Sequence, residues 1–132
     1  MAAEEWKEIL GWGTEELDDI RFVGYSYLKQ GKYDLALTFF EALVVLNPTN
    51  SYDLQTLGAL YLQMGKNLMA LSYIERALKV DPTHLPTQLN RAKALFALGY
   101  KKQALTQAKN LQIVPNPHIA DQATALILAY SS

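Results

Sequence analysis

Cysteine is absent from this chain of 132 residues, which excludes disulfide bonds and thiolate metal sites. A chain without cysteine is compatible with a reducing cytoplasm. The sequence has no run of about 18 apolar residues, so we expect no membrane-spanning helix. The first residues, Met1–Lys7, are acidic and lack the basic region and apolar stretch of a signal peptide.

Motifs that carry chemistry are also missing. The sequence has no glycine-rich phosphate loop and no Gly-x-Ser-x-Gly elbow, and His84 and His118 both stand near prolines at expected helix starts. Acidic pairs such as Glu15-Glu16 are typical of the first turn of a helix. The few lysines are not interleaved with aromatic residues, which argues against nucleic-acid binding. We therefore expect no enzyme, no cofactor and no metal site.

The two halves of the chain differ in the sign of their charge. Residues 1–66 contain ten acidic and five basic residues, a net charge of −5. Residues 67–132 contain three acidic and seven basic residues, a net charge of +4. One interpretation is a solvated surface whose charge drifts along the chain. The other is a polarity that orients a partner or favours head-to-tail self-association.

An internal repeat is the strongest pattern that the sequence does contain. Eleven residues of the segment 17–50 recur at the same spacing in 51–84, namely Asp19, Gly24, Tyr27, Leu28, Gly31, Lys32, Ala36, Leu37, Glu41, Pro48 and Thr49. A period of about 34 residues with these residue types is typical of the tetratricopeptide repeat (TPR), a helix–turn–helix unit. Such units stack into a curved surface that usually holds another polypeptide, so the repeat predicts a binding protein.

The pattern predicts one all-α domain, a TPR superhelix of three helix–turn–helix repeats with an N-terminal helix and a C-terminal capping helix. The single TPR domain covers 1–132, with the N-terminal helix at 2–12, repeats at 17–50, 51–84 and 85–116, and the capping helix at 118–131. We call the first helix of each repeat the A helix and the second the B helix. Thr14 is the expected N-cap of the first A helix, Leu17–Gln30.

Small residues recur where the A and B helices of one repeat are expected to touch. Gly58→Leu or Ala70→Phe is therefore expected to overpack this contact by about 1–3 kcal/mol. The small positions are Gly24, Gly58 and Ala92 on the A helices and Ala36, Ala70 and Ala104 on the B helices.

The concave face of such a stack is lined by A-helix positions that the A–B contact leaves free. Here these positions mix apolar side chains with hydrogen-bonding ones, which suits an extended peptide whose backbone needs partners. The alternative is that some of these side chains lie buried beneath the terminal helices. The candidate peptide-binding residues are Arg21, Tyr25, Leu28, Tyr52, Gln55, Ala59, Leu62, Gln63, Leu89, Asn90, Lys93 and Phe96.

One known type of TPR groove is not expected in this chain. TPR domains that bind the acidic tail of heat-shock chaperones share a clamp of lysine, asparagine and arginine residues on their A helices. At the corresponding positions this chain has Arg21, Tyr25, Thr56, Pro86 and Asn90. Only Arg21 has a fitting charge, so the sequence argues against a clamp for two carboxylates.

The repeats, the expected N-terminal helix and the segment Tyr25–Pro48 resemble the TPR chaperones of bacterial type III secretion, and the resemblance covers about residues 5–115. The resemblance lies in the turn Gly31–Tyr33, the segment Phe40–Leu43 and the turn Met64-Gly65, and it is strongest to the class II chaperones of translocator proteins. It implies a cytoplasmic chaperone without ATPase activity that keeps an extended apolar segment of a secreted client soluble and export-competent. The matching groove positions are Arg21, Tyr25, Leu28, Ala59 and Leu62, where Arg21 departs from the aromatic type often found in the family.

The resemblance also assigns a role to the N-terminal helix, which in that family often mediates homodimerisation. Trp6, Ile9, Leu10 and Trp12 are the candidates for such a patch, and the alternative is that they pack on the first repeat. Two other functions stay open. One is a TPR scaffold that joins cytoplasmic proteins, and the other is a chaperone of the needle subunit or another export component.

Overall fold

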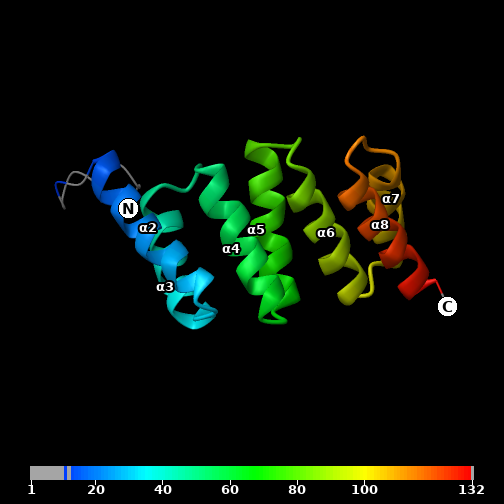
Figure 1. Cartoon of the computed structure of the whole chain (residues 1–132), viewed down its shortest axis with the longest axis horizontal. Coiled ribbons are helices and arrows are strands. Elements are labelled where there is room, and N and C mark those ends of the chain that lie inside the picture. The colour runs from blue at the N-terminus through cyan, green and yellow to red at the C-terminus, as the bar shows by residue number, and fades with distance from the viewer. Residues whose placement is uncertain (1–10, 12, 132) are drawn as a thin grey trace.

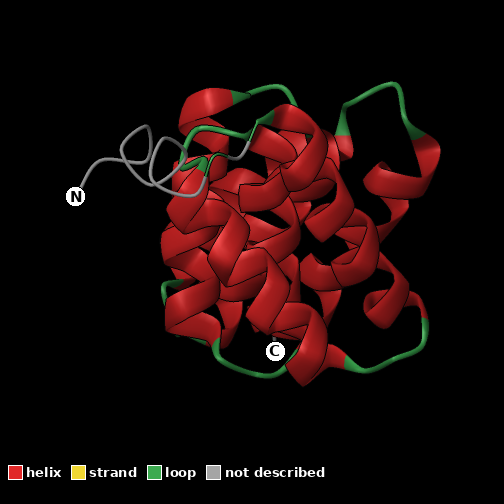
Figure 2. Cartoon of the chain, turned by 90° about the vertical axis from the view of Figure 1, so that its left-hand side faces the viewer, coloured by secondary structure: helices red, strands yellow, loops and turns green. Residues whose placement is uncertain are grey.

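The computed structural model describes Gly11 and residues 13–131, and these residues form seven α-helices and no strand. The helices follow one another along the long axis of the molecule, with α2 toward one end and α8 at the other (Figure 1). Seen from the end, they pack side by side and are joined by short loops (Figure 2). The predicted all-α fold of helical hairpins is confirmed. The N-terminal helix expected at 2–12 lies, except for Gly11, outside the described residues.

Six of the helices pair into three hairpins, each of which turns at a glycine. Gly31, Gly65 and Gly99 have φ angles of 74°, 75° and 85°, a left-handed conformation that glycine adopts without steric cost. The backbone closes each turn in the same way, as where the Lys32 N–H donates to the Tyr27 carbonyl at 2.9 Å. The hairpins are α2 (Thr14–Lys29) with α3 (Tyr33–Leu46), α4 (Ser51–Gln63) with α5 (Asn67–Val80), and α6 (Leu85–Ala97) with α7 (Lys101–Gln112).

The start of α2 corrects one expectation from the sequence. Its N-cap is Gly13, not Thr14, and the helix begins at Thr14 rather than at Leu17. The Glu16 carboxylate accepts a hydrogen bond from the Gly13 N–H at 2.8 Å, which satisfies an amide that would otherwise lack a partner. This hydrogen bond also lowers the pKa of Glu16. The first turn is therefore closed by an acidic side chain from inside the helix.

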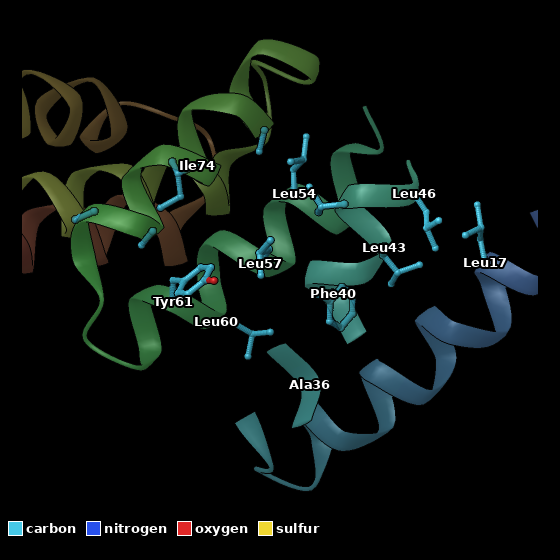
Figure 3. Close-up of a cluster of buried hydrophobic side chains, with 14 residues drawn as sticks. Leu17, Ala36, Phe40, Leu43, Leu46, Leu54, Leu57, Leu60, Tyr61 and Ile74 are labelled. Atoms are coloured by element: carbon cyan, nitrogen blue, oxygen red, sulfur yellow. The ribbon is translucent and has the colours of Figure 1, made fainter. Parts of the chain in front are cut away.

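The main hydrophobic core joins the first two hairpins. Phe40, Leu43, Leu57 and Ile74 are fully buried and point from neighbouring helices into the shared interior (Figure 3). At Gly58 the two helices of the second hairpin approach so closely that a Cβ atom would lie 2.8 Å from Cγ1 of Ile74. The small residue at this A-helix position is thus required by packing, as the repeat pattern predicts.

The C-terminal helix α8 (Pro117–Tyr130) packs on both helices of the third hairpin. Ile119 and Ala123 of α8 share a buried cluster with Leu89 and Leu111. In the sequence, Ile119 and Ala123 stand one full repeat period after Leu85 and Leu89 of the third A helix. The helix therefore takes the place of a further A helix. Within the described residues, no helix combines the length and the apolar character needed to cross a membrane.

Candidate peptide-binding groove

A pocket of about 290 Å³ lies where the three A helices meet. Leu28 of α2 forms one side, α4 forms the middle, and the start of α6 forms the other side. Five of the predicted groove residues come together here, namely Leu28, Tyr52, Gln55, Ala59 and Asn90. The same pocket is also lined by Thr56, His84, Pro86 and Thr87.

The chemistry of the pocket is mixed. Leu28, Ala59 and Pro86 contribute apolar walls, and Tyr52 is 43 % exposed. The side-chain amides of Gln55 and Asn90 form no hydrogen bond with the rest of the described chain, so both can pair with a ligand. A pocket of this kind accepts an apolar side chain and offers donors and acceptors to the backbone beside it.

Two further lining residues hold each other in place. The Thr87 hydroxyl lies 2.7 Å from Nδ1 of His84, the N-cap residue of α6, and Thr87 is only 3 % exposed. Thr56, for its part, donates its hydroxyl hydrogen to the Tyr52 carbonyl at 2.8 Å. The repeat pattern alone did not place these three residues in the groove. The position of His84 could have been predicted from the sequence, because His84 directly precedes the helix whose first turn carries Pro86 and Thr87.

Arg21 serves a different purpose from the one that the sequence predicts. Its Nε and Nη2 atoms donate to the two carboxylate oxygens of Asp53 at 2.6 and 2.8 Å, and its Nη1 donates to Asp18 at 2.5 Å. The hydrogen bond to Asp53, which is fully buried, raises the pKa of Arg21. Arg21 thus ties the first A helix to the second instead of offering a free cation to a ligand.

Three other predicted residues on the first two A helices stand apart from the pocket. Tyr25 is 42 % exposed, and the ammonium group of Lys29 lies 5.6 Å from the centroid of its ring. Leu62 is partly buried against the main core cluster, and Gln63 is exposed. A ligand that extends beyond the pocket would meet Tyr25 and Gln63 as surface residues.

The third repeat departs from the prediction, because α8 covers it. Leu89 is 3 % exposed and packs with Ile119 and Ala123, so it does not face a groove. Phe96 is 5 % exposed, and its ring stacks on that of Tyr130 with centroids 4.6 Å apart. Both residues are core residues in this structure, which corrects the expectation that they contact a peptide.

Lys93 lies beside α8 in a second hollow of about 300 Å³, which is lined by Gln122, Ala125, Leu126 and Ala129. The proposed N-terminal patch of Trp6, Ile9, Leu10 and Trp12 lies outside the described residues. Within the described part of the chain, no group of three or more histidine, aspartate or glutamate side chains is arranged to hold a metal ion.

The family model described as "Anaphase-promoting complex, cyclosome, subunit 3" matches residues 29–111. A search of curated protein sequences gave no significant match. Many solved structures share the fold, at sequence identities that establish the fold alone.

Two of these structures are type III secretion chaperones with a bound partner segment. The Yersinia enterocolitica chaperone SycD in complex with a peptide of the translocator YopD is 21 % identical, with a TM-score of 0.81, over 90 % of this chain and 95 % of that chain. PcrH, from Pseudomonas aeruginosa, in complex with the chaperone-binding region of PopD is also 21 % identical, with a TM-score of 0.81, over 92 % of this chain and 95 % of that one.

A third structure with this fold holds a different kind of peptide. It is the first TPR domain of Spaghetti (RPAP3) bound to the HSP90 peptide SRMEEVD. It is 23 % identical with a TM-score of 0.78, and the match covers 91 % of this chain and 97 % of that chain.

Proposed function

This chain belongs to the TPR family whose model is described as anaphase-promoting complex, cyclosome, subunit 3, and on that premise we propose that it is a secretion chaperone of the translocator-binding type. It acts in the cytoplasm, without catalysis. Its concave face holds an extended apolar segment of a secreted client and keeps that client soluble and competent for export.

The pocket shared by the three A helices is the observation that carries this proposal. An extended peptide presents side chains to the pocket and backbone donors and acceptors beside it. The apolar walls of Leu28, Ala59 and Pro86 suit an aliphatic client side chain, and the amides of Gln55 and Asn90 suit the client backbone. The likeness of fold to SycD and PcrH, whose structures hold translocator segments, supports the same use of this face.

The side chains of the pocket favour binding over catalysis. The hydrogen-bonded pair Thr87 and His84 is the arrangement in the pocket that most resembles a nucleophile with its base. Thr87 is almost fully buried, so its hydroxyl is not presented to a substrate. The pair instead fixes the start of α6 and, with it, one wall of the pocket.

The test uses a charge placed in the pocket. Ala59→Glu puts an unpaired carboxylate against the apolar walls and is expected to weaken binding of an apolar segment at least about tenfold. Leu68→Glu, which places the same charge on an exposed residue of the paired helix α5 outside the pocket, is the matched control. Affinity capture from the native cytoplasm with mass spectrometry compares both variants with the wild type, and circular dichroism verifies that they fold.

We expect one hydrophobic exported protein in the captures with the wild type and with Leu68→Glu, and we expect the capture with Ala59→Glu to lack it. The same client, expressed alone, should be insoluble and should become soluble on co-expression with the wild-type chain. If all three chains capture the same partners, and those partners are soluble by themselves, the chain is a scaffold whose binding surface lies elsewhere.

A further inference from the structure

The charges of the chain are divided between the two long edges of the superhelix. The three hairpin turns lie along one edge, and the loops that join successive hairpins lie along the other (Figure 1). We define the turn edge as residues 29–35, 63–69 and 97–103, and the loop edge as residues 13–19, 47–53, 81–87 and 115–121. The turn edge contains five lysines and one aspartate, a net charge of +4, whereas the loop edge contains seven acidic residues and no lysine or arginine. The sign of the charge therefore reverses across the superhelix and not only along it.

The two edges are far enough apart to act separately on a charged surface. The helices run from one edge to the other, and α4, with 13 residues, is about 20 Å long. The Debye length at physiological salt is about 8 Å, so a surface that touches the turn edge is screened from the acidic loop edge. No ion pair between described residues neutralises the lysines of the turn edge. All five are exposed, namely Lys29, Lys32, Lys66, Lys101 and Lys102.

Exposed apolar side chains accompany these lysines. Leu68, in the first turn of α5, is 68 % exposed, and Tyr100, the N-cap of α7, is 49 % exposed. The large exposed apolar residues of the turn edge all belong to the N-cap or the first turn of α3, α5 or α7, namely Tyr33, Leu35, Leu68, Met69 and Tyr100. Exposed apolar side chains gathered on one surface mark a site of contact with a protein or a membrane.

We infer that the turn edge docks on the surface of a bilayer that contains anionic lipids. The residue types favour lipid over protein. The basic residues of the turn edge are all lysines, and the three arginines of the chain, Arg21, Arg76 and Arg91, lie elsewhere. Arginine is enriched and lysine is depleted at protein–protein interfaces. Lysines attract anionic headgroups and extend flexible apolar stems toward them, and tyrosine suits the same layer because its ring is apolar and its hydroxyl is polar.

This inference does not depend on the proposed function, because none of the residues that line the groove pocket belongs to the turn edge. A chain docked by its turn edge presents the lysines to the headgroups and holds the acidic loop edge away from them. The repulsion between the loop edge and an anionic surface favours the same orientation.

Co-sedimentation of the full chain with lipid vesicles tests the inference. We expect binding to vesicles of equal parts phosphatidylcholine and phosphatidylglycerol, none to phosphatidylcholine alone, and release at about 1 M salt, where the Debye length is about 3 Å. Lys101→Glu combined with Lys102→Glu should weaken binding at least about tenfold, since each lysine near such a surface contributes a factor of about five. Both residues lie in the first turn of α7, where the helix dipole favours acidic side chains, and circular dichroism verifies the fold.

Lys79→Glu combined with Lys109→Glu is the matched control. It changes the net charge by the same amount, on exposed residues in the last turns of α5 and α7, away from the turn edge. This control should bind the anionic vesicles as the wild type does. Equal losses in the two double variants would overturn the inference, because net charge and not the turn edge would then govern binding.

A wild-type chain that does not bind the anionic vesicles would also overturn the inference. If that chain instead retains an acidic soluble protein that the variant with Lys101→Glu and Lys102→Glu loses, the turn edge is a protein interface and not a lipid-binding surface.

Discussion

Replacing Gly58 by alanine tests the tight contact between the two helices of the second hairpin. The added Cβ would lie 2.8 Å from Cγ1 of Ile74 and 3.3 Å from the Ile74 backbone nitrogen, and Ile74 is fully buried. Overpacking of this kind costs about 1–3 kcal/mol. Replacing glycine by alanine inside a helix also stabilises the folded state by about 1 kcal/mol, because alanine has the higher helix propensity. We therefore expect Gly58→Ala to lower the free energy of unfolding by up to about 2 kcal/mol.

A second background separates these two effects. Ile74→Ala removes the atom that the new Cβ would strike and by itself costs about 2–5 kcal/mol. In that background Gly58→Ala should stabilise the protein by about 1 kcal/mol, because the clash with the Ile74 side chain is gone and the higher helix propensity of alanine is the main remaining effect. Urea unfolding followed by circular dichroism measures all four proteins. If Gly58→Ala stabilises the wild type as much as it stabilises Ile74→Ala, the contact is not tight and the reasoning from the repeat register fails.

Two further predictions concern the polar ties between repeats. Arg21→Met leaves the buried Asp53 carboxylate unpaired and should lower the free energy of unfolding by about 3 kcal/mol. Asp18→Ala removes only an exposed partner of Arg21 and should lower it by less than about 1 kcal/mol. Similar losses of stability for the two variants in urea unfolding would contradict this prediction. Burial, together with the hydrogen bond to Glu41, raises the pKa of Tyr61 in the folded protein. The contribution of Tyr61 to the free energy of unfolding is therefore complete below the unfolded pKa of about 10, and it is lost as the pH rises through the higher folded pKa. Stability should therefore fall more steeply above about pH 10 in the wild type than in Tyr61→Phe, and equal slopes in urea unfolding would refute that role.

The hairpins could be predicted from sequence because glycine and proline mark their turns. Gly31 and Gly65 are needed at positive φ, and the prolines at 48 and 82 end the helices before them, so the repeat period fixes where most helices begin. The start of α2 was harder to predict. Thr14 and Gly13 are both acceptable caps, and the choice depends on the Glu16 side chain, which reaches back to the Gly13 amide.

The groove was predictable in its middle and not at its C-terminal end. Gln55, Ala59 and Asn90 meet in one pocket because the A-helix register determines the face on which each lies. Leu89 and Phe96 follow the same register but are covered by α8. The sequence does indicate that α8 covers this end of the groove. Tyr130 stands 34 residues after Phe96, which in turn stands at the same repeat position as Leu28 and Leu62. Reading the period through the last helix would have predicted a fourth A helix there.

Which peptide a TPR domain can bind depends on the side chains that line its groove and not on the fold of its backbone. The first TPR domain of Spaghetti shares the fold and holds SRMEEVD, a peptide with three acidic residues. In this chain the pocket contains no lysine or arginine among its lining residues, and the guanidinium of Arg21 is already paired with Asp53 and Asp18. A carboxylate that entered the pocket would lose its hydration without gaining a cation, which costs free energy. An aliphatic side chain would lose only water that the apolar walls hold poorly. On the function proposed for this chain, the pocket therefore favours an uncharged segment.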